Sequence, residues 1–175
     1  HYNEAPYASP IEVNKKAYKI EDESGVEGIS LDQNSATLPV NDDAQKTITL
    51  TATVTPEGTD TPTVWTSSNE AVATVADGVV TAVGKGTAII TATAGSKSAA
   101  CTVTVVKKVE SLSIVGDNAV AQGYTIQLTA TASPEDASDA SVVWASGDES
   151  IAKVDQTGKV TAVGGGSATI MATAK

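Results

Sequence analysis

Few residues in this sequence could do chemistry. The chain has one histidine, His1, and one cysteine, Cys101. Nucleophilic catalysis needs a base held beside its nucleophile, and a histidine at the first position does not supply one inside a folded domain. Cys101 alternates with Val103 and Val105, so we interpret it as a small buried hydrophobe on a β-strand, not as a reactive thiol. A single cysteine also excludes an intrachain disulfide.

Paired carboxylates are the remaining route to acid–base catalysis. The acidic pairs all lie among turn-forming residues: Asp42-Asp43, Glu135-Asp136 and Asp148-Glu149. Turn geometry and solubility account for them. We therefore predict that the chain is not an enzyme and needs no cofactor.

Calcium binding is the alternative use of the acidic loops, because Ca²⁺ prefers carboxylate and carbonyl oxygens. Asn41-Asp42-Asp43 and Gly116-Asp117-Asn118 each precede a long predicted strand, at matching places in a repeat described below. Neither segment has EF-hand spacing. Asp42, Asp43 and Asp117 are thus candidate ligands of a weakly bound Ca²⁺, and solvated loops are the simpler interpretation.

The composition of the chain restricts the classes of partner that it could bind. All 11 basic residues are lysine, against 21 acidic residues, and the net charge is −10. Such a chain repels nucleic acid and anionic membranes, and no apolar run reaches the length that spans a bilayer. Aromatic residues make up 3% of the chain and Phe is absent. The core must therefore consist of Val, Ile, Leu and Ala around the two tryptophans.

A repeat organises the chain: Thr63–Ala94 recurs as Val142–Ala174, with Trp65 matching Trp144. The pattern is one of short strands. Thr47–Thr55 alternates apolar residues with threonine, and Asp77-Gly78 is a two-residue hairpin signal. Comparison of the two copies indicates which side chains of each strand point inward and which point outward. Positions that stay apolar in both copies are predicted to point inward, as at Val80 and Ile90, and their neighbours Val79 and Ile89 outward.

The repeat predicts two small domains, at residues 26–106 and 107–175, after a segment 1–25 that we interpret as the tail of a preceding domain plus a linker. The joint at 105–110 contains no Gly, Ser or Pro, which predicts a stiff rod. Lys175 aligns with Gly95, so domain 2 lacks a counterpart of the last strand, Ser98–Val106. Either the chain end is trimmed or disordered, or another segment supplies that strand.

Several motifs occur in the same order in both copies, among them Leu50-Thr51-Ala52-Thr53, Trp65-Thr66-Ser67-Ser68 and Gly86-Thr87-Ala88. Residues 26–175 thereby resemble the bacterial immunoglobulin-like domain, group 2. The resemblance implies an all-β fold of two tandem immunoglobulin-like β-sandwich domains without disulfides, each of about seven strands with its tryptophan between the sheets. It also implies occurrence in bacterial surface proteins, including intimin- and invasin-like adhesins, and in virion proteins of tailed phages. It carries over no catalytic residue.

We expect a non-enzymatic structural or adhesion module, extracellular, on a virion or a bacterial cell surface. Its expected partners are cell-surface glycans or proteins and other subunits of a surface assembly. Tyr124, the one aromatic residue of the repeats besides the tryptophans, is the candidate binding residue. The Tyr-containing segment before domain 1 is typical of the end of a different fold, which favours the virion. The alternative is an accessory module that holds a secreted enzyme near its polymer.

Overall fold

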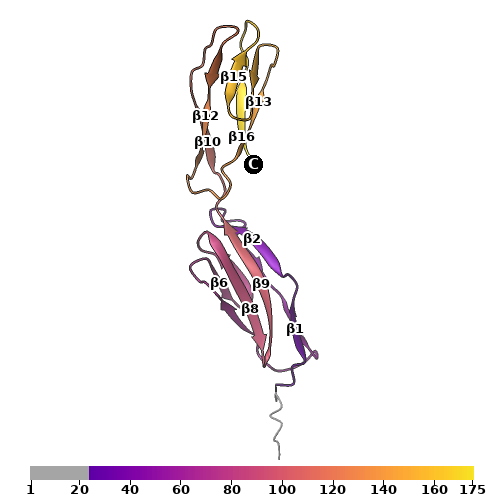
Figure 1. Cartoon of the computed structure of the whole chain (residues 1–175). Helices are drawn as coiled ribbons and strands as arrows, with labels where there is room; N and C mark the ends of the chain where they lie inside the picture. Colours follow the sequence, from indigo (N-terminus) through magenta and orange to yellow (C-terminus); the bar gives the residue numbers. More distant parts are fainter. Residues whose placement is uncertain (1–23) are drawn as a thin grey trace, which may run out of the picture.

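The computed structural model describes residues 24–175, and these form two β-domains stacked end to end (Figure 1). We call residues 26–106 domain 1 and residues 107–175 domain 2. No helix occurs within residues 24–175, and therefore none in this range is able to cross a membrane. The all-β prediction is confirmed. The predicted tail and linker, residues 1–25, lie almost wholly outside the described residues.

Domain 1 is built from nine strands. They are β1 (Gly28–Leu31), β2 (Ser35–Pro39), β3 (Thr47–Thr49), β4 (Ala52–Thr55), β5 (Val64–Ser67), β6 (Ala73–Ala76), β7 (Val79–Ala82), β8 (Gly86–Ala94) and β9 (Lys97–Val106). The largest sheet has the order β2-β9-β8-β5, in which β2 runs parallel to β9. Facing it are the sheet β3-β7-β6 and the pair β1-β4. Pro39 ends the edge strand β2, as predicted for a residue that has no N–H to donate.

The structure divides the segment predicted as one strand, Thr47–Thr55. Its first part, β3, pairs with β7, and its second part, β4, pairs with β1. At the change of partner, Leu50 N–H donates to Gly78 O (2.8 Å) and Thr51 N–H to Asp32 Oδ1 (2.9 Å). The alternation of burial continues across the break. The segment was therefore predicted correctly in its faces and wrongly as one continuous strand.

The faces predicted from the repeat are confirmed. Val80 and Ile90 are 0% exposed, whereas Val79 and Ile89 are 42% and 47% exposed. Cys101 is buried on β9, as the alternation of that strand predicts. The predicted hairpin is also present, since Ala76 pairs with Val79 across Asp77 and Gly78. Both turn residues have positive φ, 48° and 81°, as a turn that follows the strand twist requires.

Domain 2 repeats this plan with seven strands in the described residues. They are β10 (Ser111–Val115), β11 (Thr125–Gln127), β12 (Thr129–Ser133), β13 (Val142–Ser146), β14 (Ala152–Val154), β15 (Lys159–Ala162) and β16 (Ile170–Ala174). Their sheets are β10-β12, β11-β15-β14 and β13-β16. Leu128, Trp144 and Val160 form the buried centre.

The two domains differ at one sheet edge. In domain 1, β8 lies between β5 and β9, and β9 also pairs with β2. Within the part of the chain that the structure describes, domain 2 has no counterpart of β9, and β16 pairs only with β13. The connection from β10 to β11, residues 116–124, contains no strand where domain 1 has β2. In the described residues, β16 is therefore paired along one edge only, and the segment that corresponds to β2 is a loop.

Glycine at position 78 is expected to be indispensable, and Gly58 in the same domain is the matched control. A Cβ on Gly78 would lie 2.5 Å from Leu50 O and 3.2 Å from Trp65 Cζ2, whereas a Cβ on Gly58 meets nothing within 4 Å. Both residues have similar positive φ, 81° and 85°. Gly58→Ala should therefore lower the free energy of unfolding only by the cost of a Cβ at positive φ, about 1 to 2 kcal/mol. Gly78→Ala should cost about 3 kcal/mol or more, because overpacking is added.

The measurement is urea unfolding followed on the backbone amide NMR signals of domain 1 in each variant. Equal losses of unfolding free energy in the two variants would show that the contact with Trp65 does not constrain the turn.

Candidate functional site

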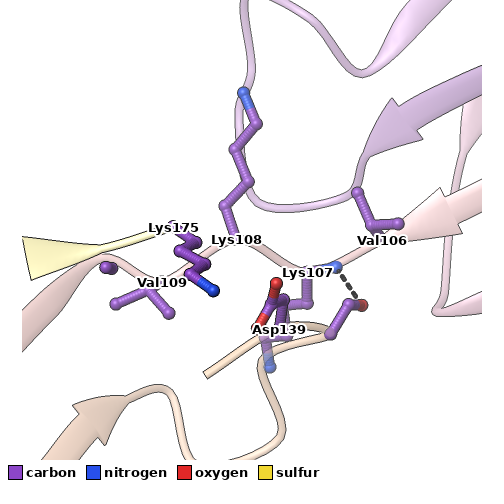
Figure 2. Close-up of a pocket in the computed structure, with 8 residues that line it drawn as sticks. Val106, Lys107, Lys108, Val109, Asp139 and Lys175 are labelled. Atoms are coloured by element: carbon purple, nitrogen blue, oxygen red, sulfur yellow. Dashed lines mark hydrogen bonds between the residues drawn. The ribbon is translucent and has the colours of Figure 1, made fainter. Parts of the chain in front are cut away.

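Polar side chains from both domains converge on the linker between β9 and β10, residues 107–110. We call this linker, together with the loops 41–45 and 136–139 that contact it, the junction. A hollow of about 410 Å³ lies beside the linker, lined by Val106, Lys107, Lys108, Val109, Ser138, Asp139, Ala174 and Lys175. Figure 2 shows Lys108 extending from the linker towards a loop of domain 1. The junction is thus a polar site to which both domains contribute.

Asn41 ties domain 1 to the linker backbone. Its Nδ2 donates to Lys108 O (2.9 Å) and to Glu110 Oε1 (2.8 Å), and its Oδ1 accepts from Lys108 N–H (2.9 Å). The amide side chain therefore bonds to both backbone groups of one residue, much as a neighbouring strand would. Just before it, Val40 N–H donates to Val106 O (2.8 Å) and extends the parallel pairing of β2 with β9. Asn41 continues that pairing past the end of the sheet.

Lys108 adds a side-chain contact on the same side. Its Nζ lies 3.2 Å from Asp42 Oδ2 and 3.1 Å from Gln45 Oε1. Exposed ion pairs of this kind contribute about 0 to 1 kcal/mol, because solvent screens them. The bonds from Asn41 to the backbone therefore hold the geometry more firmly than this ion pair.

Domain 2 holds the other side of the linker. Lys107 N–H donates to Ser138 Oγ (2.9 Å), drawn as a dashed line in Figure 2, and Ser138 N–H donates to Lys107 O (2.7 Å). Glu110 N–H donates to Ser133 O (2.8 Å). Lys85 of domain 1 reaches directly across, its Nζ lying 2.9 Å from Asp136 O. Lys107, Lys108 and Glu110 of the linker are thus each hydrogen-bonded to one domain or the other, and the stiffness of the linker stays a prediction.

Two carboxylates in or near the junction have lowered pKa values. The hydrogen bond and the charge of Lys107 lower the pKa of Asp136, and the hydrogen bond and the charge of Lys46 lower that of Asp43. Desolvation opposes both shifts, and at Asp136 it is second only to the hydrogen bond from Lys107. Each group therefore stays ionised to a lower pH when folded than when unfolded, and its ion pair is lost only as pH falls through the lowered pKa.

The calcium candidates have different contacts, and Asp117 lies in the other domain from Asp42 and Asp43. Asp42 contacts Lys108 in the junction, and Asp43 pairs with Lys46 in domain 1. Asp117 lies in domain 2, where it lines a groove together with Ile126 and Leu128. Among residues 24–175 no three His, Cys, Asp or Glu side chains are grouped to hold a metal ion. Calcium binding by these residues stays a prediction.

The aromatic residues divide as the sequence suggested. Trp144 is 5% exposed in the centre of domain 2, and Trp65 packs against the core of domain 1. Tyr124 is 70% exposed, and its backbone bonds to Ala121 O and Ala162 N–H hold its position. Tyr124 is therefore free to contact a partner, and whether it binds one stays a prediction.

Turn geometry accounts for the acidic residue Asp148, a member of one candidate carboxylate pair. Its Oδ1 accepts from Ser150 N–H (2.9 Å) and Ser150 Oγ (2.6 Å), and these bonds lower its pKa. A carboxylate with a lowered pKa is a poor general acid or base near neutral pH. The geometry thus agrees with a structural role.

The profile of a family described as Bacterial Ig-like domain (group 2) matches residues 25–105 and 108–175. The chain belongs to this family. The resemblance read from the motifs of the two copies is thereby confirmed, and so is the fold class of two tandem immunoglobulin-like domains. Family membership makes the chain an immunoglobulin-like structural module.

Relatives carry the same kind of domain within longer proteins. An uncharacterized protein of Clostridium acetobutylicum is 37% identical over 152 residues, which are 82% of this chain and 15% of that protein. Lacto-N-biosidase of Bifidobacterium bifidum is 54% identical over 52 residues, which are 30% of this chain and 5% of that enzyme. The chain thus spans a small part of the curated relatives that it matches.

Among solved structures, the S-layer protein SbsC is similar at 24% identity with a TM-score of 0.36. The match covers 86% of this chain and 26% of that one. This is a distant likeness, and the fold assignment rests on the family match.

Sequence reasoning missed the function of Asn41, which it named only as part of a candidate calcium loop. The available signal was indirect: a linker without Gly, Ser or Pro needs hydrogen-bond partners for its peptide groups. It did not say which of the flanking polar residues supply them, because Asn41 and Lys108 are far apart in sequence and meet only in the folded chain.

Removing the Asn41 side chain should loosen the junction without unfolding either domain. Asn41→Ala deletes three hydrogen bonds that no other side chain replaces, and exposed bonds of this type contribute only about 0.5 to 1.5 kcal/mol each. We expect a wider distribution of interdomain angles in residual dipolar couplings and small-angle scattering, with both melting transitions nearly unchanged. Asp43→Ala is the matched control, since its contact with Lys46 does not cross the junction. The same interdomain alignment in both variants would refute the role of Asn41.

Calcium titration tests the acidic loops. With Asp42 and Asp43 each paired to a lysine, we expect 5 mM or so of Ca²⁺ to leave the melting temperature unchanged, because only an ion that binds the folded state stabilises it. A rise in melting temperature that Asp42→Asn or Asp117→Asn abolishes would instead establish a calcium site.

Proposed function

We propose that the chain is a non-enzymatic, extracellular structural and adhesion module that acts as a stiff spacer on a virion or a bacterial cell surface. The observation that carries this proposal is the junction, whose linker is hydrogen-bonded on both sides. A spacer has to hold its outer end away from the surface, and a bonded linker resists the bending that a Gly/Ser linker allows.

Adhesion in this proposal is weak and depends on many copies. In the described residues, the outward faces of the strands are largely threonine, and Tyr124 is the one strongly exposed aromatic ring. A single ring and a polar sheet face give little affinity per molecule, but many displayed copies raise the overall avidity. The partners proposed are cell-surface glycans or proteins, together with other subunits of the assembly that displays the module.

The virion and the cell surface are both consistent with a stiff module. The segment before domain 1 favours the virion through its sequence alone. The sequence of the full-length protein distinguishes the two, because a capsid or tail domain identifies a virion and a wall anchor identifies an adhesin.

A second candidate function is an accessory module of a secreted enzyme. The observation that favours it is the 54% identity to a segment of a bifidobacterial lacto-N-biosidase. In that setting the module would hold a separate catalytic domain at a fixed distance from its polymer. A hydrolase domain in the same polypeptide would establish this alternative.

Adhesion is testable on a glycan array with the chain displayed in many copies on a particle. We expect binding by the multimer and little by the monomer, with Tyr124→Ala reducing the signal at least about fivefold if stacking on the ring contributes. Val115→Ala, a change at another exposed apolar residue, should leave the signal unchanged. If the multimer bound neither any glycan nor intact bacteria, the adhesion function would be refuted and only the spacer function would remain.

A further inference from the structure

The linker between the domains contains two adjacent lysines, Lys107 and Lys108. Adjacent lysines occur at one other place in the sequence, residues 15–16, which lies outside the described residues. The other lysines between residues 24 and 174 lie within one domain, in a strand or in a connection between its strands, and they are Lys46, Lys85, Lys97, Lys153 and Lys159. In this range, Lys107 and Lys108 are therefore the two lysines at which a single cut would separate the domains.

Proteases of the trypsin type bind a lysine side chain in an acidic pocket and cleave the peptide bond that follows it. They hold the substrate as an extended segment whose N–H and C=O groups pair with the protease, in the manner of an added strand. A lysine of a folded protein is therefore cleaved only where its side chain is accessible and its backbone groups are free to pair.

In the junction, all four backbone hydrogen-bonding groups of the two lysines are occupied. Lys107 N–H donates to Ser138 Oγ (2.9 Å), and Lys107 O accepts from Ser138 N–H (2.7 Å). Lys108 N–H donates to Asn41 Oδ1 (2.9 Å), and Lys108 O accepts from Asn41 Nδ2 (2.9 Å). A protease would have to break these bonds, two to each domain, before it could pair with the linker.

The side chains of the two lysines are accessible, although their ammonium groups are paired. The side chain of Lys107 is 31% exposed and that of Lys108 is 49% exposed. Lys107 Nζ lies 2.9 Å from Asp136 Oδ1, and Lys108 Nζ lies 3.2 Å from Asp42 Oδ2. Exposed ion pairs of this kind contribute little, because solvent screens them. The side chains therefore protect the linker less than the backbone hydrogen bonds do.

We propose that Lys107-Lys108 is a latent cleavage site for trypsin-type proteases, which Asn41 and Ser138 protect and which becomes accessible when the domains release the linker. Cleavage hydrolyses the peptide bond after Lys107 or Lys108. The hydroxyl group of water adds to the carbonyl carbon, and the remaining hydrogen goes to the amide nitrogen of the next residue. The products are domain 1 and domain 2 as separate chains. The site belongs to the linker alone and does not depend on what the module binds.

The test is limited digestion of the full 175-residue chain with trypsin, in which the masses of the products locate each cut. A synthetic peptide with the sequence of residues 103–112 measures cleavage of the same linker without the junction. We expect the linker of the folded chain to be cut at least about a hundredfold more slowly than the peptide, because cleavage requires the junction to open first.

Asn41→Ala and Ser138→Ala test the protection from each domain separately, so the test survives if one variant fails to fold. Each variant should be cut at the linker at least about fivefold faster than the unmodified chain, because each lost hydrogen bond raises the population of the open linker. Asp43→Ala is the matched control. Its carboxylate contacts Lys46 and not the linker, and the variant should be cut at the unmodified rate.

Cuts after the strand residues Lys97 and Lys153 in the same digests report unfolding of the domains, and they should stay equally slow in all variants. Lys107→Gln combined with Lys108→Gln should abolish the separation of the domains. Cleavage of the unmodified linker as fast as that of the peptide would overturn the proposal. So would unchanged linker cleavage in Asn41→Ala and Ser138→Ala, or an equal acceleration at Lys97 and Lys153, since the cuts would then follow unfolding of the domains.

Discussion

Each sandwich depends on the contact between a tryptophan ring and the glycine of the adjacent hairpin turn. A Cβ on Gly78 would come within 3.2 Å of Trp65 Cζ2, and one on Gly158 within 3.0 Å of Trp144 Cζ2. The same hypothetical atoms would lie 2.5 and 2.4 Å from the carbonyl oxygens of Leu50 and Leu128. Because the chain has no Phe, the tryptophan is the one large core piece in each domain, and the turn backbone must approach its ring closely. That close approach holds the hairpin turn against the segment that contains Leu50 in domain 1 and Leu128 in domain 2. It thereby positions the sheet to which the hairpin belongs.

The two domains share this contact but differ in the sheet that lies opposite the hairpin, which is β2-β9-β8-β5 in domain 1 and β13-β16 in domain 2. β9 buries Cys101, Val103 and Val105 in domain 1, and each fully buried valine is worth about 1.5 to 3 kcal/mol relative to exposure. Within residues 24–175, domain 2 has no strand that makes this contribution. The same sequence pattern around Trp144 therefore supports a smaller buried centre.

Side-chain faces were predictable from sequence, and strand partners were not. Ile90 and Ile89 could be assigned to opposite faces because alternation has a period of two and the repeat shows which position must stay apolar. The change of partner at Leu50 and Thr51 could not be predicted, since both parts of the segment alternate in the same way and only the spatial neighbours differ. The hydrogen-bond partners of Asn41 at the junction could not be predicted for the same reason. Its amide is a partner of the linker only because β2 runs parallel to β9 and ends beside it.

The polar contacts of the junction are the physical basis for predicting that the two small domains keep one orientation. Ion pairs such as Lys108 with Asp42 are exposed and contribute little, so they do not by themselves fix an angle. Hydrogen bonds to the backbone are more directional, and Asn41 and Ser138 place them on consecutive linker residues from opposite domains. A bend at Lys107 or Lys108 would break bonds on one side or the other. The prediction of a stiff linker therefore rests on the bonding of its peptide groups and on the absence of Gly, Ser and Pro, the residues that would relax it.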